Sequence, residues 1–236
     1  MPFTSDEFLN LFEEYNLSLW PLQMLLYLLG IFAITFIMIR KRTEGVAVNV
    51  ALAILWFWMG AVYHLLYFST INSLAFLFGI FFIIQSAIFI WSGVLGKQLV
   101  YRWKLDIKGI VGFLFVIFSF LVYPFLSAFF GHSYPQTPTF GLPCPTTIFT
   151  FGILLFSAKK LPWYIFIIPL LWSFIGFSAA LNLDMKEDYS LLVAGITGAL
   201  FLIFSKYPKN NGREVSLKKK LFILHLFRLP LPYYAE

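Results

Sequence analysis

The side chains best suited to bind a metal ion or exchange a proton near neutral pH are two histidines and the single cysteine of a strongly apolar sequence. These residues are His64, His132 and Cys144. Two imidazoles and a thiolate form a ligand set that suits copper or zinc. No local spacing such as His-x-x-x-His accompanies them, so a metal site requires that the fold bring the three residues together.

Cys144 stands directly before Pro145, which fits the first position of a helix. At the N-cap, the partial positive charge of the helix end would favour the thiolate and make Cys144 reactive or metal-binding. The alternative interpretation is a buried thiol that packs as a small apolar side chain. A lone cysteine forms no intramolecular disulfide.

His64 lies within an apolar stretch, on the same helical face as Tyr67. Histidines inside membrane spans face the bundle interior and are often functional, but a neutral imidazole bonded to a neighbouring hydroxyl explains this one equally well. His132 follows another stretch in which Tyr123 and Ser127 lie four residues apart. The candidate residues of a ligand or transport site are His64, Tyr67, Tyr123, His132, Cys144, Thr146 and Thr147.

Residues 131–145, which include His132 and Cys144, combine closely spaced prolines and glycines with a lack of Asp, Glu, Lys and Arg. The apolar helix expected after it, residues 146–158, would reach only about 20 Å at about 1.5 Å per residue. We therefore expect a re-entrant-like loop that dips into the membrane and lines a binding site. A compact plug packed between helices is the alternative interpretation.

The elements that must hold these residues are apolar helices. Hydrophobic residues make up 60% of the 236-residue chain and charged residues 12%, whereas soluble domains are roughly half apolar and about a quarter charged. Segments this apolar must satisfy their own backbone hydrogen bonds in lipid, which favours helices. We predict an all-α integral membrane bundle of seven transmembrane helices over residues 20–39, 46–68, 71–95, 109–130, 146–158, 161–183 and 189–205.

The basic residues predict how this bundle is oriented, because Lys and Arg are retained on the cytoplasmic side. All but one of the 17 basic residues fall on alternate connections or in the C-terminal tail, and the exception is Lys186. The N-terminus is therefore expected outside and the C-terminus in the cytoplasm. No nucleic-acid partner is expected, and the oligomeric state stays open.

Both ends of the chain are expected to lie on the membrane surface. Residues 1–19 should form an outer interfacial segment, since Thr4 and Glu7 make a capping box before an amphipathic helix. Residues 206–236 form a basic cytoplasmic tail, whose lysines at 218–220 precede a short apolar run. This tail is expected to bind anionic lipid.

The predicted spans in residues 20–205 contain no Asp, Glu, Lys or Arg. Charged groups inside a membrane are costly and persist for function, so their absence disfavours a proton relay. A retinal pigment is excluded because the last span has no lysine to form the Schiff base.

The sequence also resembles an uncharacterised bacterial multi-pass membrane family, a domain of unknown function of the 6064 type, over about residues 3–205. The segments that carry the resemblance are residues 131–147, Tyr15-Asn16, Trp20-Pro21-x-Gln23 and Tyr63-His64. The resemblance implies a bacterial cytoplasmic membrane and no particular activity.

Three functional hypotheses follow. The first is binding or transport of a small uncharged solute or soft metal ion from the outer face, through the loop around Cys144. The second is a membrane enzyme or redox protein that uses Cys144 or a histidine-bound cofactor, and the third is a structural partner subunit of a membrane complex. No catalytic residue or cofactor is assigned, and a role without catalysis is favoured.

The orientation can be tested with reporter fusions. A reporter that is active only outside the cytoplasm should be inactive when fused after Ser205 or within residues 97–108, because the basic residues keep both regions inside. The same reporter inserted after residue 133 should be active. Activity at either of the first two sites would contradict the predicted orientation.

Overall fold

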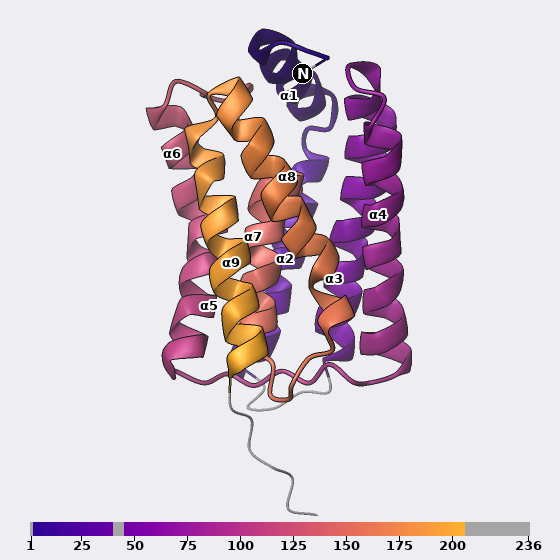
Figure 1. The fold of residues 1–236 in the computed structure, drawn as a ribbon, viewed down its shortest axis with the longest axis vertical. Helices are drawn as coiled ribbons and strands as arrows, with labels where there is room; N and C mark the ends of the chain where they lie inside the picture. Colours follow the sequence, from indigo (N-terminus) through magenta and orange to yellow (C-terminus); the bar gives the residue numbers. More distant parts are fainter. Residues whose placement is uncertain (1, 40–44, 206–236) are drawn as a thin grey trace, which may run out of the picture. The chain divides into compact units, whose positions relative to one another are not determined.

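The computed structural model describes residues 2–39 and 45–205, which form a helical bundle (Figure 1). The predicted all-α fold class is therefore confirmed for these residues. The α-helices are α1 (Ser5–Ser18), α2 (Leu22–Ile39), α3 (Val46–Trp58), α4 (Ala75–Ile88), α5 (Ile107–Ile117), α6 (Tyr123–Phe129), α7 (Pro143–Leu155), α8 (Ile167–Leu183) and α9 (Tyr189–Phe204). Helices α3, α4 and α5 continue as π-helical turns over Met59–Tyr67, Phe89–Leu95 and Phe118–Val122. The predicted lipid-binding tail lies outside the described residues.

Several of these helices are suited to a membrane, which indicates a membrane protein. Five helical segments are long and apolar enough to cross one, namely Leu22–Ile39, Val46–Thr70, Ala75–Leu95, Ile107–Phe129 and Lys186–Phe204. Helices α7 and α8 are apolar but shorter. Each of the seven segments overlaps one of the predicted stretches.

The outer faces of the long helices carry large apolar side chains. On α2, for example, Leu25 is 58% exposed, Leu28 is 59% exposed and Phe32 is 46% exposed. Contiguous apolar surface of this kind is rare on soluble monomers and marks contact with lipid or another apolar partner.

Helix α7 is short because protein surrounds it. It lies in the middle of the bundle (Figure 1) and contacts α5, α8 and α9. Every side chain from Pro145 to Leu155 is buried. The helix begins at Pro143, slightly before the predicted start at Thr146, because proline is tolerated in the first helical turn.

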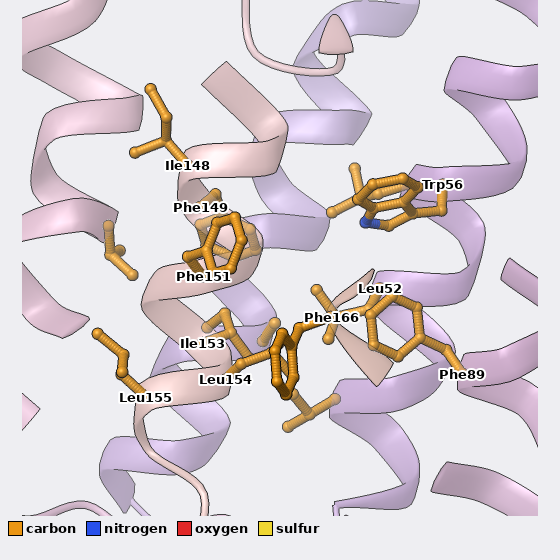
Figure 2. Packing of buried hydrophobic residues seen from close by; sticks show 14 of the residues in the cluster. Leu52, Trp56, Phe89, Ile148, Phe149, Phe151, Ile153, Leu154, Leu155 and Phe166 are labelled. Atoms are coloured by element: carbon orange, nitrogen blue, oxygen red, sulfur yellow. The ribbon is translucent and has the colours of Figure 1, made fainter. Parts of the chain in front are cut away.

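Aromatic rings fill the space between α7 and the helices facing it. Figure 2 shows Phe151 of α7 and Phe166 lying opposite Trp56 and Phe89. The indole N–H of Trp56 donates to the hydroxyl of Thr150 at 3.0 Å, which satisfies a polar group that would otherwise be buried without a partner.

The predicted capping box at the start of α1 is confirmed, with Thr4 and Glu7 bonded to each other's backbone N–H groups. Helix α1 lies at one end of the bundle and packs against it (Figure 1). The Tyr15 phenol accepts a hydrogen bond from the Trp58 indole at 2.7 Å. Burial raises the pKa of Tyr15 above its ordinary value, so this phenol stays protonated.

Asn16 at the end of α1 holds the loop that precedes α7. Its amide N–H₂ donates to the carbonyl groups of Pro135 at 2.6 Å and Thr137 at 2.8 Å. Its amide oxygen accepts from the Thr139 hydroxyl at 3.0 Å and the Gln23 amide at 2.7 Å. One buried side chain thus satisfies backbone and side-chain groups of an irregular segment, which is the condition for such a segment to lie inside a protein.

We expect Asn16→Ala to destabilise the fold by about 1–3 kcal/mol, because the loop carbonyls lose their donors while they stay buried. The measurement is the apparent melting temperature of the purified protein in detergent. Asn10→Ala is the matched control, since Asn10 is exposed on the same helix. Equal melting temperatures for the two variants would contradict this role of Asn16.

Candidate functional site

A cavity of about 520 Å³ lies beneath α1, between α8 and the ends of α3 and α4 nearest to α1. Its walls are mostly apolar. Phe8 and Phe12 come from α1, Phe78 from α4, and Ile175 and Ala179 from α8. Small-molecule sites typically have volumes of about 300–1,000 Å³ and a similar excess of apolar lining. The cavity is therefore our candidate binding site.

One wall of the cavity is polar, and it is built where α7, α8 and α9 meet. Cys144 from the first turn of α7 and Asp188 from the turn before α9 both line it, and the thiol of Cys144 lies beside the carboxyl group of Asp188. Trp172 of α8 also lines the cavity and is only 8% exposed. Its indole N–H lies beside the Cys144 sulfur but has no acceptor of good geometry.

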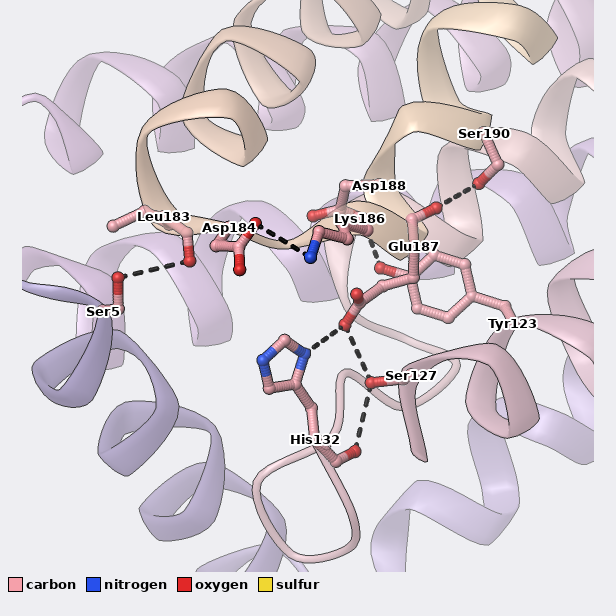
Figure 3. A network of polar contacts seen from close by, with 10 residues as sticks. All are labelled: Ser5, Tyr123, Ser127, His132, Leu183, Asp184, Lys186, Glu187, Asp188 and Ser190. Atoms are coloured by element: carbon pink, nitrogen blue, oxygen red, sulfur yellow. Dashed lines mark hydrogen bonds and ion pairs between the residues drawn. The ribbon is translucent and has the colours of Figure 1, made fainter. Parts of the chain in front are cut away.

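Asp188 is positioned by a tight connection between α8 and α9. Asp184 ends α8 in the left-handed conformation, at φ 58°, which short polar side chains tolerate. A 3₁₀ turn over Lys186–Asp188 follows and directs the side chain of Asp188 inward, where it is 4% exposed. The hydroxyl of Tyr123 donates to Asp188 Oδ1 from the opposite side (Figure 3).

Glu187 forms a second buried carboxylate beside Asp188 and is fully buried. Its Oε1 atom lies 2.9 Å from His132 Nδ1 and 2.9 Å from Ser127 Oγ (Figure 3). The other oxygen, Oε2, has no hydrogen-bond partner among the described residues. The side chain of His132 is 14% exposed, and its imidazole forms an ion pair with Glu187 when it is protonated.

His64 is fully buried, and both of its ring nitrogens lack a hydrogen-bond partner in the described part of the chain. The predicted bond to a neighbouring hydroxyl is therefore not formed. Its ring instead packs among aromatic rings, with centroids 4.6 Å from Phe82 and 5.1 Å from Trp172. Trp172 and Phe78 separate His64 from the cavity, because both line the cavity and both contact its ring.

The sequence candidates thus fall into separate places. Of the predicted metal ligands His64, His132 and Cys144, Cys144 alone lines the cavity. Among residues 2–39 and 45–205, no three His, Cys, Asp or Glu side chains lie close enough together to hold a metal ion. Cys144 lines the cavity and His132 pairs with Glu187. His64 packs instead against Trp172 of α8.

Two of the remaining candidates have hydrogen-bond partners among the described residues, and Thr147 does not. Tyr67 pairs with Ser18 at 2.7 Å, away from the cavity. The hydroxyl of Thr146 accepts from the backbone N–H of Gly141 at 2.9 Å, while that of Thr147 is buried without a partner. Residues 137–142 of the preceding loop are buried, and Leu142 lines the cavity.

Sequence reasoning missed Glu187, Asp188 and Trp172. The two acids follow Lys186 in a connection that the basic residues predict to lie outside the membrane. The available signal was their place directly before an apolar helix, together with the Tyr123 and Ser127 pair that faces them. The spacing of Tyr123 and Ser127 identified the hydroxyl side of this contact. The fold is needed to show that Glu187 and Asp188 form the carboxyl side.

Comparisons with known proteins give a family and no activity. The family model described as "Family of unknown function (DUF6064)" matches residues 5–213. No curated protein and no solved structure gives a significant match.

The pairing of His132 with Glu187 makes a testable contribution to stability. We expect His132→Ala to cost up to about 3–5 kcal/mol, because it leaves the buried carboxylate without its charge partner. Adding Glu187→Gln should recover part of this loss, since a neutral amide needs no counter-charge. The measurement is a double-mutant cycle on the free energy of unfolding, with the exposed Glu14→Gln as control. Additive effects of His132→Ala and Glu187→Gln would show that the two residues are not coupled.

Proposed function

Because the chain belongs to DUF6064, a family of unknown function, we propose a function from its own geometry. The protein binds a small, mostly apolar and uncharged molecule in the cavity beneath α1. The observation that carries this proposal is a cavity of about 520 Å³ whose lining is mostly apolar and includes the polar groups of Cys144, Trp172 and Asp188. Such a site suits a ligand whose apolar body fills the volume and whose single polar group is held at Cys144 and Asp188.

The polar wall indicates what that group is. The Trp172 indole N–H is a buried donor without a partner, and an unsatisfied buried donor costs free energy that a ligand acceptor would offset. The residues lining the cavity include Asp188 and no Lys, Arg or His. A negatively charged ligand would find no counter-charge there, so a hydroxyl or carbonyl oxygen is the group that fits.

We propose the predicted membrane topology as the setting of this site. Helices α7 and α8 would complete seven membrane segments with the five longer ones, and the distribution of basic residues supports an outer N-terminus. The cavity would then face the outer side of a bacterial cytoplasmic membrane. Of the predicted roles in binding or transport, binding is the one that the cavity supports directly.

Filling the cavity tests this proposal. Ala179 lines the cavity and is half-buried, so Ala179→Phe should occupy the ligand's volume without removing any core packing. Ala128→Phe is the matched control, because Ala128 is exposed on α6. A molecule that binds the folded state raises its stability. We therefore expect 1-octanol to raise the melting temperature of the wild type and of Ala128→Phe, but not that of Ala179→Phe.

The charge of the polar group is tested with matched probes of the same chain length. Octanoate should stabilise the wild type less than 1-octanol does, because its carboxylate meets Asp188. The proposal fails if Ala179→Phe responds to 1-octanol as strongly as Ala128→Phe does, since the probe would then bind elsewhere.

A further inference from the structure

Helix α1 closes one side of the cavity, and exposed apolar side chains border another side. Phe3, Phe8 and Phe12 line it from the N-terminal segment. The hydroxyl of Ser5 bonds to the carbonyl of Leu183 at 3.2 Å, which ties the start of α1 to the end of α8. The Phe8 and Phe68 rings, with centroids 5.9 Å apart, tie α1 to the end of the α3 segment. Helix α1 therefore forms a roof over the cavity.

Helices α4 and α8 form the opposite border. They are joined at depth, where the Gln85 amide donates to the carbonyl of Ile165 at 2.9 Å and the Phe82 and Trp172 rings lie 5.0 Å apart. Beyond this contact α8 leans away from α4 towards the end where α1 lies (Figure 1). The cavity occupies this diverging region, because its lining comes from both helices.

Most exposed residues of the rim between the two helices are apolar, and Ser178 of α8 is its polar member. Leu74 before α4 is 55% exposed, Phe174 of α8 is 50% exposed and Ile175 of α8 is 37% exposed, although all three line the cavity. Their neighbours Leu77 and Leu171 are exposed on the same helices and outside the cavity. The rim thus continues the apolar surface that the long helices would present to lipid. An opening that faced water would instead be expected to carry mainly polar side chains.

We infer that the cavity takes a neutral, single-chain amphiphile directly from the membrane, through the gap between α4 and α8. The inference rests on the proposed binding function and adds the source and class of the ligand. The hydroxyl or carbonyl head meets Trp172, Cys144 and Asp188, and the chain passes between Leu74 and Ile175 into the lipid. A chain much longer than the cavity is then accommodated, because its remainder stays in the bilayer.

The test uses the full chain in liposomes that contain a photoreactive diazirine derivative of 1-hexadecanol. Labelled peptides are identified by mass spectrometry after illumination. Ile175→Trp narrows the rim, and Leu171→Trp is its matched control one helical turn away on the same exposed side of α8. We expect labelling of the peptide that contains Cys144 to fall about tenfold in Ile175→Trp and to stay unchanged in Leu171→Trp.

A second measurement separates the route from the site itself. Stabilisation by 1-octanol is therefore measured on the wild type and on Leu171→Trp, which lies outside the cavity, so that it reports on the binding site independently of the rim. If 1-octanol binds but hexadecanol labelling is the same in both tryptophan variants, the lateral route is overturned and the proposed binding function stands. If neither probe gives a signal above that of Ala179→Phe, both proposals fail. Equal labelling by the corresponding diazirine derivative of hexadecanoic acid would overturn the neutral head.

Discussion

The constraint on which this structure depends is that the irregular segments buried in an apolar chain must find hydrogen-bond partners within the protein. Protein surrounds helix α7 and supplies hydrogen-bond partners for its hydroxyls. Trp56 donates to Thr150, and the backbone N–H of Gly141 donates to Thr146. The loop before α7 meets the constraint through Asn16, whose amide uses both donors and its acceptor. Irregular backbone is tolerated at this depth only with such partners, so α1, the loop and α7 form a single packed unit.

The same constraint explains where the charges lie. Glu187 and Asp188 are buried at the end of the bundle nearest α1, where the His132 side chain and the Tyr123 hydroxyl reach them. Burying a carboxylate without such partners would cost several kcal/mol or more. Placing both acids in the short turn between α8 and α9 leaves the middle of the bundle free of charge. It also brings one of them, Asp188, to the wall of an otherwise apolar cavity.

Much of the fold could be predicted from the sequence, because apolar runs, the capping box at Thr4 and the shortness of the helix after Pro145 are all local properties. The central place of α7 could not, since burial on all sides depends on which helices surround it. The metal set of His64, His132 and Cys144 stays a prediction, since only the fold decides whether residues at one end of a bundle share a site. Of the three, His64 packs against Trp172 of α8.

The roof and the polar wall of the cavity are parts of one connected structure. Phe12 lines the roof, and four residues further along α1 Asn16 binds the loop at Pro135 and Thr137. That loop continues into Cys144, which lines the polar wall. Movement of α1 away from the bundle would therefore pull on the segment that carries Cys144. By contrast, the hydrogen bond and ring contacts between the described parts of α4 and α8 gather around Gln85 and the ring of Trp172. These connections make the α4 and α8 side the part of the wall that can widen with least disturbance to the polar contacts that hold the site together.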